Sequence, residues 1–123
     1  MKTFLYYCII LCLTVMVQTA HTVPIAIDLE VTNGESGIYV LFSDGRLQTA
    51  GTVINRGFPA NINAVDFTLT NSERGYYILD ENGTIYTYGD AVLYGRPFSS
   101  TSRYVDFELT QTGTGYYLSL IHI

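Results

Sequence analysis

Several residue types are missing from most of this chain. Both cysteines, Cys8 and Cys12, and the only lysine, Lys2, lie near the N-terminus, and tryptophan is absent throughout. After residue 22 the chain therefore has no thiol to act as a nucleophile or zinc ligand and no lysine to act as a base. Charged residues make up only 14% of the sequence, and the net charge is −5. Such a chain lacks the basic face that nucleic-acid binding requires, so we expect no nucleic-acid partner.

Residues 1–22 have the features of a secretory signal peptide. Lys2 supplies a positive charge, and residues 4–17 form a nearly unbroken apolar stretch. This length suits a signal sequence and is shorter than the roughly 20 residues of a transmembrane helix. We expect one helix within residues 3–20, which enters the membrane only during export, and a secreted or cell-surface protein. An uncleaved N-terminal anchor is the alternative.

The rest of the chain repeats itself. Residues 26–51 align with residues 64–89 at an offset of 38, with 11 of 26 positions identical. Residues 64–78 align with residues 104–118 at an offset of 40, with eight of 15 identical. We interpret residues 23–123 as successive copies of one structural unit. The copies are expected near residues 26–63, 64–103 and 104–123, the last being incomplete.

Each copy has the pattern of short β-strands and tight turns. Hydrophobic and polar residues alternate over 65–70, which is typical of a half-buried strand. Residues 76–79 are apolar on both faces, as in a strand that is covered on both sides. Asn82-Gly83 predicts a hairpin turn before a third strand over 84–88, and 91–94 is expected to form a short fourth strand.

Four short strands in each copy, together with the offsets of 38 and 40, predict an all-β fold of four-stranded antiparallel blades. About two and a half such blades would form a partial β-propeller, and a β-sandwich is the alternative. The expected core of the second copy recurs in the first. Its residues are Val65, Phe67, Leu69, Ile78, Leu79 and Ile85, with the counterparts Ile27, Leu29, Val31, Val40, Leu41 and Leu47.

The repeats resemble those of a family of exported bacterial proteins. The similarity rests on Gly75-Tyr76-Tyr77-Ile78-Leu79-Asp80, Gly83-Thr84-Ile85-Tyr86 and Tyr88-Gly89-Asp90-Ala91. Family repeats follow the pattern VDxxxTxxGxGYYxLDxxGxxxxxGDAxxxG and are thought to build β-propellers. The first copy departs from the pattern after Gly51, where Gly-Asp-Ala becomes Gly-Thr-Val. The resemblance implies an architecture but no defined ligand and no catalytic residue.

Three residue positions recur in every copy and are candidate structural positions. They are the aspartates Asp28, Asp66 and Asp106, the glycines Gly37, Gly75 and Gly115, and the tyrosines Tyr39, Tyr77 and Tyr117. The aspartates could form a carboxylate ring that holds a cation, but a position repeated in every copy favours a side-chain hydrogen bond to a turn. The tyrosines favour packing between blades over a surface that stacks on sugars.

We therefore expect a non-enzymatic exported protein for binding or surface interaction, with an unknown protein or glycan as partner. No catalytic residue, metal site or cofactor is expected, and no binding residue is identified.

The chain ends within the third copy on an apolar strand. This ending predicts either the N-terminal piece of a longer protein or a small protein that completes a ring by self-association, and we expect the isolated chain to self-associate. The alternative function is the N-terminal part of a carbohydrate-active or other exported enzyme whose active site lies downstream.

Overall fold

The computed structural model describes residues 22–96 and 101–122, and these residues form an all-β structure. The expected signal helix within residues 3–20 lies outside the described residues. Within the described ranges there is no helix that is long and apolar enough to cross a membrane. The strands are β1 (Ala26–Val31), β2 (Gly37–Phe42), β3 (Leu47–Gly51), β4 (Ala64–Leu69), β5 (Gly75–Asp80), β6 (Ile85–Gly89), β7 (Ser102–Leu109) and β8 (Tyr116–His122).

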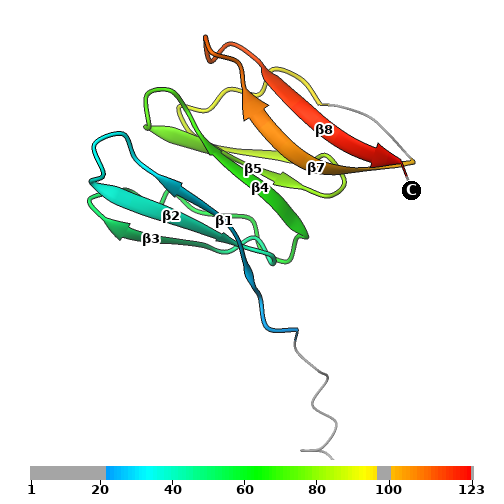
Figure 1. Ribbon diagram of the computed structural model, residues 1–123, viewed down its shortest axis with the longest axis horizontal. Helices are drawn as coiled ribbons and strands as arrows, with labels where there is room; N and C mark the ends of the chain where they lie inside the picture. Colours follow the sequence, from blue (N-terminus) through cyan, green and yellow to red (C-terminus); the bar gives the residue numbers. More distant parts are fainter. Residues whose placement is uncertain (1–21, 97–100, 123) are drawn as a thin grey trace, which may run out of the picture.

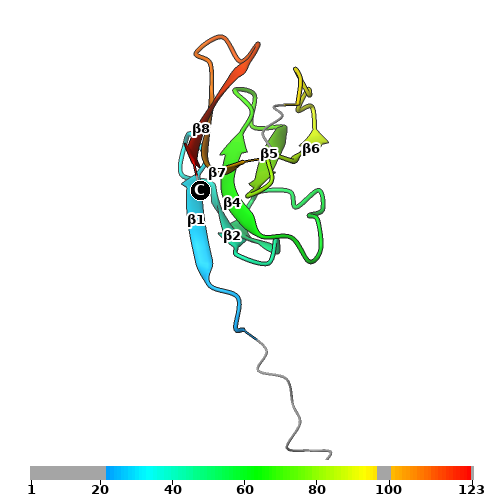
Figure 2. The same ribbon diagram turned by 90° about the vertical axis from the view of Figure 1, so that its right-hand side faces the viewer.

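The strands form three antiparallel sheets, which we number in chain order. Sheet 1 has the order β1-β2-β3, sheet 2 has the order β4-β5-β6, and sheet 3 consists of β7 and β8. Sheet 2 lies between the other two, as Figure 1 shows; Figure 2 gives the same molecule turned by 90°. The first strand of each sheet contacts the first strand of the next. The described residues thus form three sheets in series and not the two facing sheets of a sandwich.

The first two strands of each sheet pair in the same way. Strand β4 pairs with β5 in the register that β1 adopts with β2, and β7 pairs with β8 in the equivalent register. In each pair one residue interrupts the register directly before the recurring aspartate. Such a bulge bends the strand and redirects the side chains that follow. The equivalent partners are Leu29 and Val40, Phe67 and Ile78, and Phe107 and Leu118.

The prediction of four-stranded units is wrong. Sheets 1 and 2 have three strands each, and residues 91–94 form no strand. The backbone of this segment forms hydrogen bonds with a side chain and not with a neighbouring strand. The Tyr77 hydroxyl donates to the carbonyl of Val92 and accepts from its N–H, both at 3.0 Å. In sheet 1 the hydroxyl of Tyr39 donates to the carbonyl of Ile54 at 3.3 Å. Tyrosine hydroxyls thus satisfy the backbone groups that a fourth strand would have paired.

The core consists of two layers, one on each face of sheet 2. The first layer joins sheets 1 and 2 through Tyr39, Leu41, Leu47, Phe67, Leu69, Tyr76 and Ile78. The second joins sheets 2 and 3 through Tyr77, Leu79, Ile85, Tyr104 and Phe107. Every residue of β5 is buried. This confirms the prediction that residues 76–79 form a strand covered on both sides.

Three expectations about the core need correction. Leu29 and Val31 are more than half exposed, because no sheet among the described residues covers that face of sheet 1. Val65 packs toward sheet 3, whereas Phe67 and Leu69 pack toward sheet 1. The simple alternation over 65–70 placed these three side chains on one face, and the bulge before Asp66 puts Val65 on the other.

Candidate functional site

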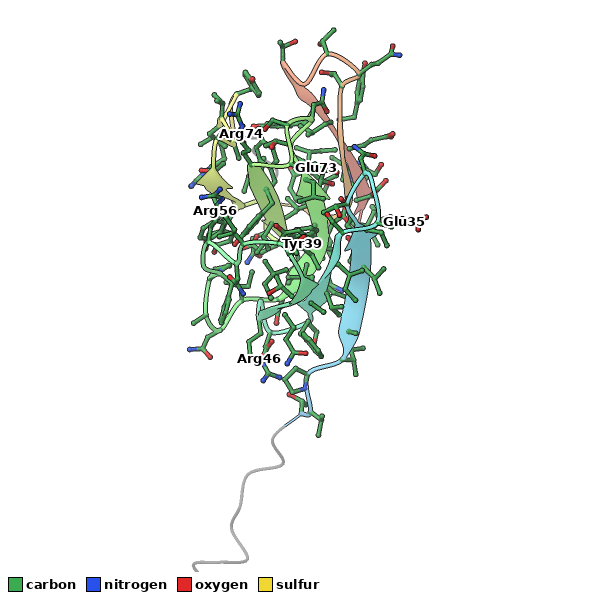
Figure 3. The ribbon with its side chains drawn as sticks, turned by 90° about the vertical axis from the view of Figure 1, so that its left-hand side faces the viewer. Glu35, Tyr39, Arg46, Arg56, Glu73 and Arg74 are labelled. Carbon is green, nitrogen blue, oxygen red and sulfur yellow. The ribbon has the colours of Figure 1, made fainter. Side chains whose placement is uncertain are left out.

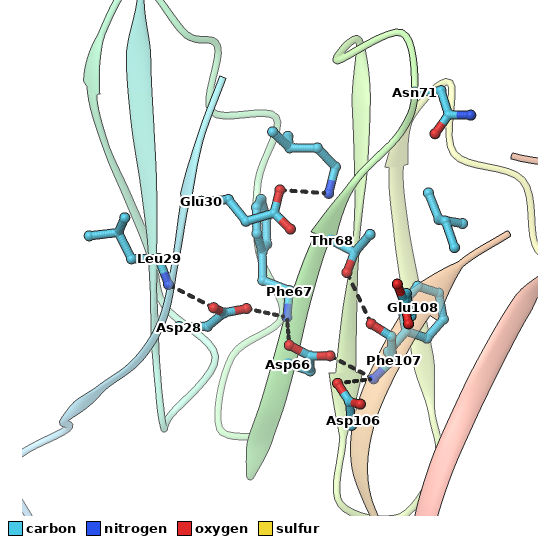
Figure 4. Close-up of a pocket in the computed structure, with 12 residues that line it drawn as sticks. Asp28, Leu29, Glu30, Asp66, Phe67, Thr68, Asn71, Asp106, Phe107 and Glu108 are labelled. Atoms are coloured by element: carbon cyan, nitrogen blue, oxygen red, sulfur yellow. Dashed lines mark hydrogen bonds between the residues drawn. The ribbon is translucent and has the colours of Figure 1, made fainter. Parts of the chain in front are cut away.

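A groove runs across the first strands of the three sheets. Strands β1, β4 and β7 are edge strands, so one side of each has no neighbouring strand within its own sheet. The groove has a volume of about 460 Å3 and contains five carboxylates and no positively charged residue. The carboxylates belong to Asp28, Glu30, Asp66, Asp106 and Glu108, which are seen in Figure 4.

Two of the three aspartates, Asp28 and Asp66, connect the backbone of their own strand to that of the next sheet. Asp28 accepts the N–H of Leu29 through Oδ1 at 2.8 Å and the N–H of Phe67 through Oδ2 at 3.0 Å. Asp66 repeats this with the N–H of Phe67 at 2.9 Å and the N–H of Phe107 at 2.6 Å. The carboxylates therefore supply hydrogen-bond acceptors to N–H groups that an edge strand leaves unpaired.

A second row of contacts lies two residues further along these strands. The Oε2 of Glu30 accepts the N–H of Leu69 at 3.3 Å, and the hydroxyl of Thr68 donates to the carbonyl of Phe107 at 3.2 Å. Figure 4 shows both bonds beside the aspartate row. Sequence reasoning missed these positions, although Glu30, Thr68 and Glu108 are polar at the same place in each copy. That regular placement was the signal that could have identified them.

Asp66 has the most perturbed acidity in the groove. Its pKa is raised to about 7, mainly because burial disfavours the carboxylate, and also because the neighbouring Asp28 carboxyl disfavours its ionised form. The N–H groups of Phe107 and Phe67 lower the pKa but do not outweigh these effects. Burial also raises the pKa of Glu30 above its ordinary value, and the negative charges of Asp28 and Glu73 add to this increase. Asp66 and Glu30 therefore remain protonated up to a higher pH than ordinary carboxyl groups do.

The groove holds no recognisable metal centre. In the two described stretches of the chain, no group of three or more histidine, cysteine or acidic residues is placed to bind a metal ion. Both oxygens of Asp28 and of Asp66 already accept backbone N–H groups. The recurring aspartates thus form side-chain hydrogen bonds to backbone, as the structural interpretation expected. They act at the bulge and between sheets, whereas the sequence interpretation placed them at a turn.

Two of the recurring glycines, Gly37 and Gly75, pair with the last residue of the third strand of their sheet. A Cβ atom at Gly75 would clash with the carbonyl oxygen of Tyr88, and one at Gly37 would clash with the side chain of Val53. At Gly115 the nearest atom would be Cγ2 of Thr110 at 3.5 Å, which is an ordinary contact. The difference arises because sheet 3 has no third strand among the described residues. Close packing therefore requires glycine at the first two positions only.

The recurring tyrosines of sheets 1 and 2 also differ from that of sheet 3. Tyr39 and Tyr77 are buried, with their hydroxyls bound to backbone, whereas Tyr117 is 68% exposed. Tyr76 is also buried, which raises the pKa of its hydroxyl to about 12. Core packing is therefore the role of these buried rings. Among the three recurring positions, only Tyr117 offers an aromatic ring to a partner.

A smaller depression of about 170 Å3 is lined by Tyr39 of β2, by the turn between β1 and β2, and by the segments that follow β3 and precede β5. Tyr39, Arg56, Glu73 and Arg74 line it and are labelled in Figure 3. The guanidinium of Arg74 lies 3.7 Å from the carboxylate of Asp90. Because this depression mixes both signs of charge, it lacks the single sign that distinguishes the groove.

Comparisons with known proteins do not extend this description. No family model, no curated protein and no solved structure matches the chain.

Proposed function

We propose that this chain is an exported, non-enzymatic binding protein whose sheets form part of a β-propeller. The observation that carries the proposal is the constant hydrogen-bond link from one first strand to the next, through Asp28 and then Asp66. Repetition of one sheet-to-sheet contact is the construction principle of circular and solenoid repeat proteins. In this interpretation the groove along β1, β4 and β7 faces the centre of the ring and is available to a ligand.

The chemistry of the groove favours a positively charged ligand. Its lining has five carboxylates and no arginine or lysine. A segment of a partner protein that carries arginine or lysine would complement these charges. A neutral glycan would need aromatic rings for stacking, and the recurring tyrosines are buried except for Tyr117, which does not line the groove. A basic protein segment is therefore the partner that we propose over a glycan.

Calorimetric titration of the purified chain with a short arginine-rich peptide tests this proposal. We expect binding that weakens as salt is added, and no binding of an acidic peptide or of neutral oligosaccharides. Glu30→Gln keeps an oxygen for the N–H of Leu69 but removes the charge, so it should weaken binding. Glu35→Gln is the matched control, because Glu35 is exposed and does not line the groove. Equal binding by both variants, or binding of oligosaccharides alone, would contradict the proposal.

One observation favours the alternative of an enzyme. The raised pKa of Asp66, about 7, and its contact with Asp28 resemble the carboxylate pairs of acid–base catalysts. Both Asp66 oxygens are engaged by backbone N–H groups, however, which favours a structural role. Assays with chromogenic glycosides between about pH 4 and pH 8 distinguish the two. We expect no turnover, whereas hydrolysis that is lost in Asp66→Asn would establish the enzyme.

Export has its own test. Mass spectrometry of the protein secreted by a host that carries the full chain should show an N-terminus near residue 21 or 23. Recovery of the intact chain from the membrane fraction would instead support the uncleaved anchor.

A further inference from the structure

The same aromatic contact joins sheet 1 to sheet 2 and sheet 2 to sheet 3. The ring centroids of Tyr39 and Phe67 lie 5.3 Å apart, and those of Tyr77 and Phe107 also lie 5.3 Å apart. In each pair the tyrosine comes from the second strand of one sheet, and the phenylalanine comes from the first strand of the next. All four side chains are buried. This pair is therefore a repeated element of the sheet-to-sheet interface.

Among the described residues, each end of the series carries one half of this pair without its partner. Tyr117 in β8 occupies the position of Tyr39 and Tyr77, and its side chain is exposed. Leu29 in β1 occupies the position of Phe67 and Phe107, and 56% of it is exposed. Val31 and Ile121 extend the two apolar faces and are also more than half exposed. Sheet 1 thus presents one face of the interface, and sheet 3 presents the opposite face.

The polar contacts of the interface are unpaired at the same two ends. Asp106 accepts the N–H of Phe107 through Oδ1 at 3.0 Å, and within residues 22–96 and 101–122 no hydrogen bond reaches its Oδ2. In Asp28 and Asp66 this second oxygen accepts an N–H of the following sheet. In sheet 1, the N–H of Leu29 is bonded to its own neighbour Asp28 but to no preceding sheet in the described part of the chain.

The second row of contacts, two residues further along the first strands, also has complementary groups at the two ends. Glu108 in β7 is at the position of Glu30, whose carboxylate accepts the N–H of Leu69 in the next sheet. Val31 is at the position of Leu69, and its N–H faces the same way because β1 and β4 pair with their second strands in equivalent register. Sheet 3 thus carries the two acceptors, Asp106 and Glu108, and sheet 1 carries the two N–H donors, on Leu29 and Val31.

We propose that a second copy of this chain docks head to tail, with sheet 3 of one copy against sheet 1 of the other. Tyr117 would pack over Leu29, while Asp106 and Glu108 would accept the N–H groups of Leu29 and Val31. The contact is heterologous, since it joins two different surfaces, so it propagates until a ring closes or a filament forms. A second copy is the occupant that the molecule itself specifies, because its two ends have the complementary halves of a contact already made twice inside the chain.

Sedimentation of the purified exported chain tests the inference. Between about 1 and 100 μM we expect a shift from monomer to a larger species. Leu29→Arg blocks the face of sheet 1, and Tyr117→Arg blocks the face of sheet 3, so each alone should weaken association at least about tenfold. Both side chains are more than half exposed, so the variants should fold, and circular dichroism checks this. Gln111→Arg, in the exposed turn after β7, is the control for added charge.

Mixing the two variants gives the sharpest test. A head-to-tail contact needs only one intact face from each partner, so equal amounts of Leu29→Arg and Tyr117→Arg should form a dimer that goes no further. A contact between identical faces could not be restored in this way. A monomer at every concentration would overturn the inference. So would assembly that survives both substitutions, which would indicate pairing along the exposed edge of β8, or a mixture that stays monomeric. None of these outcomes depends on ligand binding in the groove.

Discussion

The Oδ2 oxygen of Asp66 accepts a 2.6 Å hydrogen bond from the backbone N–H of Phe107, which lies 41 residues later and in the next sheet. The same carboxylate accepts the N–H of Phe67 on its own strand through Oδ1 at 2.9 Å. One side chain thus holds a bulge in place and fixes the position of the neighbouring sheet. An acidic residue can do this at an edge strand because a carboxylate offers two acceptors and a strand edge offers unpaired N–H groups.

Replacing the aspartates should show which of them joins two sheets. Asp66→Ala should lower the free energy of unfolding by about 1–2 kcal/mol, because it removes an acceptor from both Phe67 and Phe107. Asp106→Ala should cost less than about 0.5 kcal/mol, since only the N–H of Phe107 bonds to it in the described residues. Urea denaturation of the two variants measures the difference. Equal losses would mean that the link between sheets adds no stability.

Asp66 should make the protein less stable as the pH rises. Its pKa is about 7 in the folded chain and near the ordinary 3.8 when unfolded, so between these values the folded state binds more protons. The contribution is fully present below about pH 4 and is lost as the pH rises through 7. We expect a loss of about 1–2 kcal/mol, reduced from the ideal value by solvent screening. Denaturation of wild type and Asp66→Asn at several pH values isolates this loss, which the variant should not show.

Equivalent positions in sheets 1 and 2 should respond differently to truncation. Phe67→Ala should cost about 3–5 kcal/mol, because Phe67 is buried between sheets 1 and 2. Leu29→Ala should cost less than about 1 kcal/mol at low protein concentration, since Leu29 is largely exposed. Thermal or urea unfolding at a dilution where the chain is monomeric gives both values. A loss below about 1 kcal/mol for Phe67→Ala would show that its ring does not pack against sheet 1.

The tyrosine hydroxyls should matter only where they bind backbone. Tyr77→Phe leaves both the N–H and the carbonyl of Val92 without their partner, so we expect a loss of about 1–2 kcal/mol. Tyr117→Phe should be neutral within about 0.5 kcal/mol, because Tyr117 is exposed. Hydrogen exchange at the amide of Val92 provides a second measurement, and it should become faster in Tyr77→Phe alone. Unchanged exchange would show that another group protects this amide.

Much of the local structure could be predicted from the sequence. The alternation in β4 and the doubly apolar run of β5 depend on which residues are hydrophobic and how they are spaced, and these are properties of the chain itself. The hairpins after β2 and β5 follow from Gly45 and Gly83, which adopt the positive φ values of 93° and 86° that glycine allows. The candidate site was predictable in part, because the recurring aspartates were visible as a pattern. Their partners in the next sheet were not visible.

The order of residue types along the chain dictates that it forms strands, where its turns lie and which positions repeat, because strands and turns depend on residue type within a few neighbours. The environment of equivalent positions, in contrast, depends on how the sheets pack together. Leu29 and Phe67 share a place in the repeat, yet one is exposed and the other buried, because sheet 1 covers Phe67 and no described sheet covers Leu29. The bulge before Asp66, the raised pKa of its carboxyl, and the pairing of Tyr77 with Val92 likewise arise from groups that are distant along the chain. Burial and hydrogen bonding depend on what lies opposite a residue in space, and local sequence does not contain that information.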